Sequence, residues 1–227
     1  MGKGVLIIGE SGSGKSTAIE KLNPKTTFIV NAKGKSLPWQ GSKKQYSAEL
    51  RNYFSTDQPG LILATLKKIS DTRLEIKTVI VDDWQYVSAA ELMTKSGEKG
   101  YEKFVSVAKS IYNLADEPRQ LRDDLTVFFL THSEDVTDSD GNRKTKAKTA
   151  GKMIDNQITL EGMFTIVLYT IIEKTKEGMK YQFITNSDGI NTAKSPRGML
   201  PYKMDNDLSL VIKAIDVYEN IEIKQVA

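Results

Sequence analysis

The stretch Gly9-Glu10-Ser11-Gly12-Ser13-Gly14-Lys15-Ser16 decides the fold of this chain. It matches the pattern G-x-x-x-x-G-K-[ST], in which glycines let successive backbone N–H groups curl around a phosphate. The apolar run Val5-Leu6-Ile7-Ile8 precedes it and predicts a buried strand, and residues 15–22 after it predict a short helix. A glycine-rich loop between a strand and a helix is the context that phosphate binding requires. We therefore expect the chain to bind a nucleoside triphosphate, ATP.

The residues of this loop have separate expected roles toward the phosphates. Lys15 would reach the β- and γ-phosphate oxygens, and Ser16 would offer its hydroxyl to Mg²⁺. Thr17 would lie next to the α-phosphate, and the N-terminus of the following helix would add its positive dipole. The residues expected to hold the nucleotide are Gly9, Glu10, Ser11, Gly12, Ser13, Gly14, Lys15, Ser16 and Thr17.

Two acids follow a second buried strand. Thr78-Val79-Ile80-Val81 consists of β-branched residues, and Asp82-Asp83 comes directly after it. Phosphate chemistry needs a carboxylate at the end of a neighbouring strand to hold the metal and its water shell, and we assign this role to Asp82. Asp83 takes the position at which many ATPases carry a glutamate that polarises the attacking water. Because aspartate is shorter, we expect slow hydrolysis or the use of another base.

The only histidine of the chain, His132, ends a further predicted strand at 126–130. A lone histidine is more often structural than functional. In the expected sheet order, however, the end of this strand lies beside the γ-phosphate. That position would let His132 sense the phosphate and pass the signal to the loop that follows.

Apolar runs and helical segments alternate along the whole chain. Strands are expected at 5–8, 26–30, 78–81 and 126–130, helices at 60–70 and 91–115, and a strand pair at 164–173 and 181–185. This order predicts an α/β fold with one mostly parallel sheet, helices on both faces and a C-terminal antiparallel hairpin. We expect residues 1–227 to form one domain, with a mobile loop at 133–152 and a C-terminal helix at about 206–219.

Composition narrows the class of protein. The 227 residues include no cysteine and one histidine, and the net charge is +3. The lack of cysteine excludes disulfide scaffolds, thiol catalysis and cysteine-ligated metals, and one histidine excludes a histidine-cluster zinc or iron site. No apolar run approaches the roughly 18–20 residues of a membrane span, and no signal peptide precedes the first strand. We expect a cytosolic protein with no membrane partner.

Together these residues resemble a RecA-like P-loop ATPase, of the small phage-encoded kind described as AAA-family ATP-binding or single-strand-annealing proteins. The resemblance rests on 9–17, 79–83, 130–132 and the turn at 193–198 after the terminal hairpin. It implies a RecA-like core, ATP and Mg²⁺ as cofactors, and a homo-oligomer with ATP between subunits.

In recombinases and replicative helicases of this type, cations at such a turn reach the γ-phosphate of the neighbouring subunit. The resemblance carries this role to Lys194 and Arg197, although Pro196 departs from the usual spacing. The expected catalytic set is Lys15, Asp83, His132, Lys194 and Arg197.

The resemblance also implies a nucleic-acid partner. In such recombinases the loop after the sensing residue contacts single-stranded DNA, and here that loop is 133–152. Cations suit contact with a phosphate backbone irrespective of sequence, but the loop has no aromatic residue to stack on bases. The residues expected to bind DNA are Arg143, Lys144, Lys146, Lys148 and Lys152. A solvated charged surface is the alternative interpretation.

Three functions follow from these expectations. The first is an ATP-hydrolysing protein of phage recombination or replication that binds single-stranded DNA as an oligomer. The second is an ATP-gated scaffold that recruits a replication or packaging partner with little hydrolysis, which the missing glutamate favours. The third, a small-molecule or nucleotide kinase, fits less well because such an enzyme needs an arginine-bearing lid and the loop at 133–152 is rich in lysine.

Overall fold

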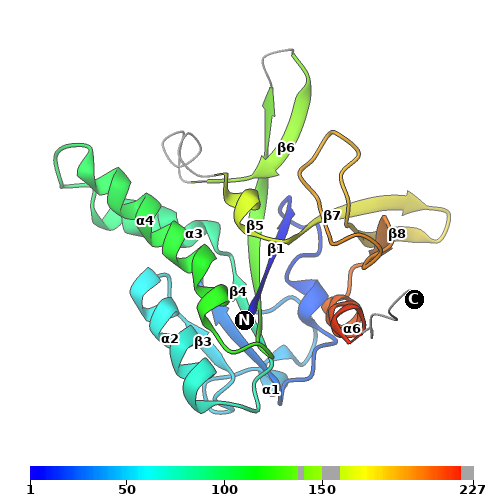
Figure 1. The fold of residues 1–227 in the computed structure, drawn as a ribbon, viewed down its shortest axis with the longest axis horizontal. Helices are drawn as coiled ribbons and strands as arrows, with labels where there is room; N and C mark the ends of the chain where they lie inside the picture. Colours follow the sequence, from blue (N-terminus) through cyan, green and yellow to red (C-terminus); the bar gives the residue numbers. More distant parts are fainter. Residues whose placement is uncertain (138–140, 150–158, 221–227) are drawn as a thin grey trace, which may run out of the picture.

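A nine-stranded sheet runs through the middle of the computed structural model, which describes residues 1–137, 141–149 and 159–220 (Figure 1). The strand order is β3-β2-β4-β5-β1-β7-β8-β9, and β6 pairs with β5 outside this path. The strands are β1 (Lys3–Gly9), β2 (Thr27–Asn31), β3 (Tyr53–Ser55), β4 (Thr78–Asp82), β5 (Thr126–Thr137), β6 (Arg143–Ala147), β7 (Ile166–Thr175), β8 (Gly178–Ile184) and β9 (Lys203–Asp205). The α-helices are α1 (Ser42–Gln45), α2 (Pro59–Thr72), α3 (Gln85–Thr94), α4 (Glu102–Asp116) and α6 (Leu208–Glu219), and the 3₁₀ helices are η1 (Thr17–Ile19), η2 (Glu117–Gln120) and η3 (Leu160–Met163).

The central strands are parallel, and β1 lies between β5 and β7. β2 pairs in parallel with β3 and β4, and β4 pairs in parallel with β5. The carboxyl ends of β1, β2, β4 and β5 therefore meet at one edge of the sheet. The register places Gly9 opposite His132 and Asn31 opposite Asp82, so residues far apart in the sequence become neighbours. In open α/β sheets this edge is where ligands bind.

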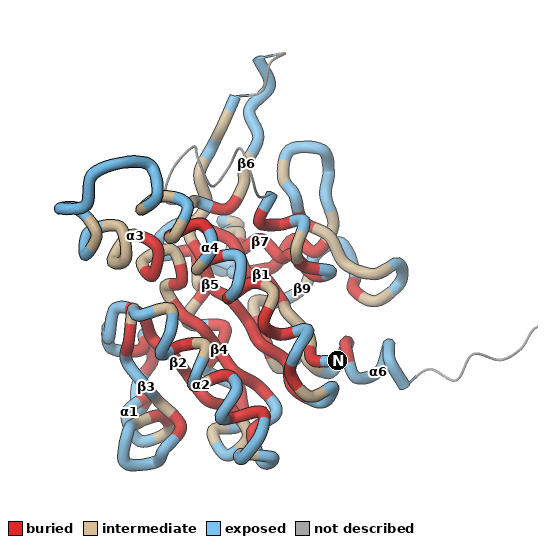
Figure 2. Tube along the Cα trace, turned by 60° about the vertical axis from the view of Figure 1, so that its left-hand side comes forward, coloured by how far each residue is buried: buried red, intermediate tan, exposed pale blue. Residues whose placement is uncertain are grey.

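Alternate residues of the buried strands pack on opposite faces of the sheet. Leu6 and Ile8 of β1 belong to the core layer under α2, α3 and α4. Val5 and Ile7 belong to the layer shared with η1 and α6. Figure 2 shows the buried strands enclosed by helices whose outer faces are exposed. Runs of apolar residues without polar alternation are what a strand buried on both faces requires.

The structure confirms the expected fold class, a mostly parallel α/β sheet with helices on both faces. The C-terminal hairpin is also present, because β7 and β8 pair antiparallel from Tyr169↔Ile184 to Thr175↔Gly178. The unforeseen short elements include the edge strands β3 and β9 and the single-turn helix α1. β3 is only three residues long, and its pattern of one half-buried and two exposed residues gives little signal in the sequence.

The prediction of a helix at 15–22 is wrong in its length. Only Thr17–Ile19 is helical, and it is a 3₁₀ turn. Ala18 N–H donates to Gly14 C=O at 3.0 Å, but Glu20 N–H already returns to Thr17 C=O at 3.0 Å. Pro24 follows too closely for further turns to form, because the residue before a proline avoids the helical region.

The single helix expected at 91–115 is two helices. α3 ends at Thr94 and α4 begins at Glu102, with Gly97 and Gly100 between them. Gly100 has a φ of 97°, a left-handed backbone that favours glycine and interrupts a helix.

The prediction of a mobile loop at 133–152 is also wrong for most of the residues that the structure describes there. β5 continues to Thr137 and pairs antiparallel with β6, from Ser133↔Ala147 to Thr137↔Arg143. The charges that suggested a solvated loop face each other across the strands: Lys146 lies 3.3 Å from Glu134, and Arg143 pairs with Asp135. Opposite charges across an antiparallel pair stabilise it. Lys152 lies outside the described residues.

Substitution of Phe129 tests how much this core contributes to the free energy of unfolding. Its ring is fully buried on β5, with centroids 4.6 Å from Trp84 and 5.6 Å from Phe164. Phe129→Ala is expected to lower the free energy of unfolding by about 3–5 kcal/mol, measured by urea denaturation. Leu74→Ala, which truncates a side chain in a residue that is 63% exposed, is the control and is expected to change it by about 0.5 kcal/mol or less. Equal losses in the two variants would contradict this account of the core.

Candidate nucleotide-binding site

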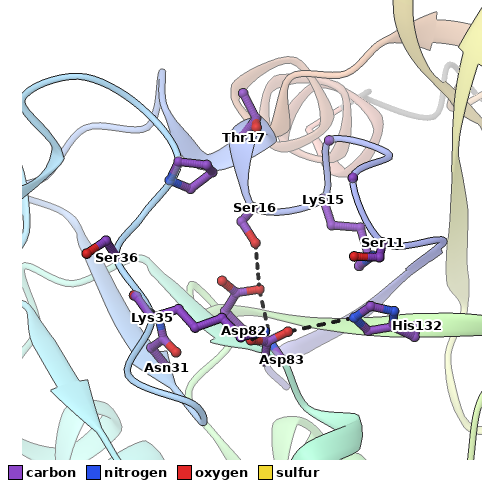
Figure 3. Close-up of a pocket in the computed structure, with 13 residues that line it drawn as sticks. Ser11, Lys15, Ser16, Thr17, Asn31, Lys35, Ser36, Asp82, Asp83 and His132 are labelled. Atoms are coloured by element: carbon purple, nitrogen blue, oxygen red, sulfur yellow. Dashed lines mark hydrogen bonds and ion pairs between the residues drawn. The ribbon is translucent and has the colours of Figure 1, made fainter.

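A cavity of about 190 Å³ lies at the carboxyl ends of β1, β2, β4 and β5 (Figure 3). It is lined by Ser11, Gly12, Gly14, Lys15, Ser16, Thr17, Asn31, Lys35, Ser36, Pro38, Asp82, Asp83 and His132. The structure therefore brings the glycine-rich loop together with both aspartates and with His132, as the sequence predicts. Asn31, Lys35 and Ser36 complete the wall from the segment that follows β2.

Strand β7 packs against the glycine-rich loop. Ser13 Oγ lies 2.5 Å from Thr170 Oγ1, and Ser13 Oγ also donates to Glu10 C=O at 2.7 Å. A Cβ on Gly9 would fall 1.7 Å from Thr170 Oγ1, so only glycine fits at this contact. Gly14 has a φ of 92°, which a residue with a side chain rarely adopts. The loop is thus held in shape by its neighbours.

Lys15 is folded back on the loop that it belongs to. Its Nζ donates to Gly9 C=O at 2.8 Å and to Glu10 C=O at 2.7 Å. Burial lowers the pKa of Lys15 to about 8, against the opposing effect of Asp82 and Asp83. A phosphate bound in the loop would offer this buried ammonium a stronger, charged partner than two neutral carbonyls.

Ser16 and Asp82 face each other across the cavity (Figure 3). Ser16 Oγ donates to Asp82 Oδ1 at 3.1 Å, and the N–H of Asp83 donates to the same oxygen at 3.0 Å. Burial, and then the neighbouring Asp83 carboxylate, raise the pKa of Asp82 to about 6. The side chain of Thr17 points away from these carboxylates.

A hydroxyl and a buried carboxylate at this spacing are hard oxygen ligands of the kind that Mg²⁺ takes. Among the described residues there is no group of three or more histidine, cysteine, aspartate or glutamate side chains that could hold a metal ion. The Ser16 hydroxyl and the Asp82 carboxylate fit Mg²⁺, with phosphate oxygens and water as its other ligands.

Asp83 occupies an unusual backbone position and is already engaged. Its φ is 59°, one of two non-glycine residues with a positive φ in the described part of the chain. Lys35 Nζ lies 2.9 Å from Asp83 Oδ2, and His132 Nε2 lies 3.9 Å from Asp83 Oδ1. Burial, and then Lys15, lower the pKa of His132, so the imidazole is neutral near pH 7. The strong partner of Asp83 is therefore Lys35.

Asn31 shapes the segment that carries Lys35. Its side chain is buried at the end of β2, where Nδ2 donates to Lys35 C=O at 2.9 Å and Oδ1 accepts from Lys33 N–H at 3.1 Å. Asn31 directly follows the predicted strand at 26–30, and neither Asn31 nor Lys35 is among the site residues expected from the sequence. The available signal was a polar residue directly after a buried parallel strand, where ligand-facing side chains gather.

Other predicted site residues lie outside this cavity. Lys194 forms a backbone bridge with Val167 of β7, with N···O distances of 2.8 and 2.9 Å, and Arg197 is exposed beyond it. Neither side chain lines the cavity in this chain. The cations Arg143, Lys144 and Lys146 lie on β6, which projects from the body of the molecule with the end of β5 (Figure 1).

The phosphate-binding loop has a defined place in the strand order. β1, which leads into this loop, is separated from β4 and its aspartates by one strand, β5, and lies beside β7. This order is consistent with the RecA-like core expected from the sequence.

Among solved structures, the chain is similar to a KaiC-like protein from the hyperthermophilic archaeon Pyrococcus horikoshii, with a TM-score of 0.47 and 11% identity. The match covers 80% of this chain and 77% of that chain. No family model matches the sequence, and no curated protein matches it. Among the described residues, no helix has the length and apolar character needed to cross a membrane.

The raised pKa of Asp82 predicts a cost in stability. The folded protein binds this proton more tightly than the unfolded chain, whose carboxyl titrates near 3.8, so ionised Asp82 destabilises the fold above about pH 6. This loss of stability becomes smaller as the pH falls below about 6, because the Asp82 carboxyl then takes up its proton. Asp82→Asn is therefore expected to raise the melting temperature of the nucleotide-free protein in EDTA at about pH 7.5, and by less at about pH 5.

Asp71→Asn is the control, because Asp71 is an exposed carboxylate on α2. It is expected to change the melting temperature little at either pH. A lower melting temperature for Asp82→Asn at about pH 7.5 would show that the ionised, buried carboxylate does not destabilise the fold.

Proposed function

We propose that this protein binds ATP with Mg²⁺ at the cavity of Figure 3 and hydrolyses it slowly. The observation that carries the proposal is the hydrogen bond of 3.1 Å between Ser16 Oγ and Asp82 Oδ1. It joins the end of the glycine-rich loop to the acid at the end of β4, which is the pair of oxygen ligands that a nucleotide-bound Mg²⁺ needs.

The proposed reaction is in-line attack of water on the γ-phosphorus. The backbone N–H groups of the glycine-rich loop and Lys15 hold the phosphates, and Asp83 takes a proton from the water. The bond from the γ-phosphorus to the β,γ-bridging oxygen breaks, giving ADP and phosphate. Mg²⁺ at Ser16 and Asp82 would neutralise charge on the β- and γ-phosphates.

Slow turnover follows from the state of Asp83. Asp83 Oδ2 lies 2.9 Å from the Lys35 ammonium, so this ion pair must separate before that oxygen can take a proton from water. Asn31 stands where an acid would activate water in many RecA-like proteins, and an amide cannot take up a proton there.

We further propose that ATP and single-stranded DNA bind in a coupled way, as in phage recombination ATPases. Support comes from the connection between the site and the hairpin of β5 and β6. His132 lies at the cavity, its C=O accepts from Lys148 N–H at 2.7 Å, and β5 continues from it into the hairpin. A γ-phosphate sensed at His132 would therefore shift the base of a cationic hairpin.

The homo-oligomer belongs to the same proposal. Lys194 and Arg197 do not line the cavity of their own chain, so a role at the γ-phosphate requires that they reach the site of a neighbouring subunit. The family resemblance supports this arrangement, with ATP between subunits.

A second candidate is an ATP-gated scaffold that recruits a replication or packaging partner and barely hydrolyses ATP. The ion pair between Lys35 and Asp83 favours it, because an occupied carboxylate suits nucleotide binding better than catalysis.

Phosphate release separates the two candidates. It is measured with and without single-stranded DNA, at about 50 and 200 mM salt, for the natural chain and for Lys15→Ala. The coupled ATPase predicts a rate that DNA raises several-fold and that falls with salt, and no rate above background for Lys15→Ala. Equal rates with and without DNA would favour the scaffold, and no nucleotide binding at all would contradict both.

Neutralising three cations tests the hairpin as the DNA contact. Lys144, Lys146 and Lys148 changed together to Gln are expected to weaken single-strand binding and to reduce the salt slope of log K by about 2, because each phosphate contact adds about 0.7. Fluorescence anisotropy of a labelled oligonucleotide measures both. The control changes Lys174, Lys176 and Lys180 to Gln, which removes the same charge from the hairpin of β7 and β8. Equal effects in both triple variants would contradict the assignment.

A further inference from the structure

The cavity holds a cation, Lys35, to which the proposed function gives no role toward the nucleotide. Lys35 lines it together with Lys15 and Ser16, and it comes from the segment after β2 rather than from the glycine-rich loop. Its Nζ lies 2.9 Å from Asp83 Oδ2. In Figure 3 the Lys35 side chain extends toward the two aspartates.

We propose that Lys35 is the residue that distinguishes ATP from ADP: it leaves Asp83 to bind the γ-phosphate and thereby frees the carboxylate. The proposal rests on the proposed function and names the regulation of the same site. Lys35 would act within its own chain, unlike the cations expected from a neighbouring subunit.

The two partners of this ion pair differ in freedom. The side chain of Lys35 is 59% exposed, whereas that of Asp83 is 12% exposed. Asp83 is fixed at the end of β4 by its neighbours, and Trp84 directly after it is fully buried. A change of partner would therefore move Lys35 and leave the aspartate in place.

The segment that carries Lys35 is anchored at its base. Asn31 binds the backbone of Lys35 and of Lys33, and Ala32 N–H donates to Asp82 C=O at 3.1 Å. Gly34, between the two lysines, has a φ of 62° and closes the turn. The backbone is thus held beside Asp82, and the long side chain of Lys35 is the part that can swing.

Lys35 also makes a cation–π contact with Tyr86 of α3. The ammonium of Lys35 lies 5.0 Å from the centre of the Tyr86 ring, and that of Lys33 lies 5.2 Å from it. Both lysines therefore share the cation–π contact, and only Lys35 also pairs with Asp83 and lines the cavity. Lys33 is consequently a matched control for charge on this segment.

Electrostatics explains the expected exchange. The γ-phosphate brings more negative charge into the cavity than the single carboxylate of Asp83, so the ammonium of Lys35 is attracted more strongly to the phosphate than to Asp83. Phosphate oxygens are strong acceptors for an ammonium, and ADP lacks the γ group. Lys35 therefore gains a new partner with ATP and keeps Asp83 as its partner with ADP.

Binding constants test the proposal without reference to hydrolysis. Calorimetry compares a non-hydrolysable ATP analogue with ADP, each with Mg²⁺, for the natural chain, Lys35→Gln, Lys35→Arg and Lys33→Gln. We expect Lys35→Gln to lose about tenfold or more in affinity for the analogue and to keep its affinity for ADP. Lys35→Arg retains the charge and is expected to restore most of the preference, and Lys33→Gln should match the natural chain.

The outcomes separate this proposal from the function on which it rests. Equal losses for both nucleotides in Lys35→Gln, no loss for either, or the same loss in Lys33→Gln would overturn the role of Lys35. If the natural chain and Lys15→Ala both fail to bind either nucleotide, the proposed function itself fails. Melting temperatures of the variants show whether any loss comes from unfolding, which the exposure of Lys35 makes unexpected.

Discussion

The site depends on the parallel pairing of β1 between β5 and β7. This pairing buries β1 on both faces and puts Gly9 directly opposite His132. It also brings Thr170 of β7 under the glycine-rich loop, where it contacts Ser13. Because parallel strands end at the same edge, the acids of β4 and the amide at the end of β2 arrive at the same cavity. Without this register the loop would have no partner for a metal ion or a phosphate.

Asp82 and Asp83 place two carboxylates next to each other in that cavity, where their negative charges repel. The surroundings of the two groups differ. Asp82 is buried, and burial, followed by the nearby charge of Asp83, raises its pKa to about 6. Asp83 turns out of the strand with a φ of 59° and pairs with Lys35. Asp82 is thus the carboxylate that we propose to bind Mg²⁺, and Asp83 is paired with a lysine of the same chain. This division fits a site that binds nucleotide readily and turns it over slowly.

The hairpin of β5 and β6 links the site to a charged surface. β5 is one strand from the buried core to the exposed tip, and His132 lies where it leaves the core. A continuous strand transmits a shift at its base more directly than a mobile loop would. The pairing of Lys146 with Glu134 and of Arg143 with Asp135 fixes the geometry of the hairpin and lowers its net positive charge.

The fold class and the centre of the site could be predicted from the sequence. The phosphate-binding pattern at 9–16 and the β-branched run before Asp82 are local signals, because each depends on residues that are adjacent in the chain. The contacts of Asn31 and Lys35, the contact of Thr170 with Ser13, and the pairing of β5 with β6 became apparent only in the tertiary structure. Each of these joins residues through strand register or through a side chain that reaches across the cavity, and a single sequence carries no record of such contacts.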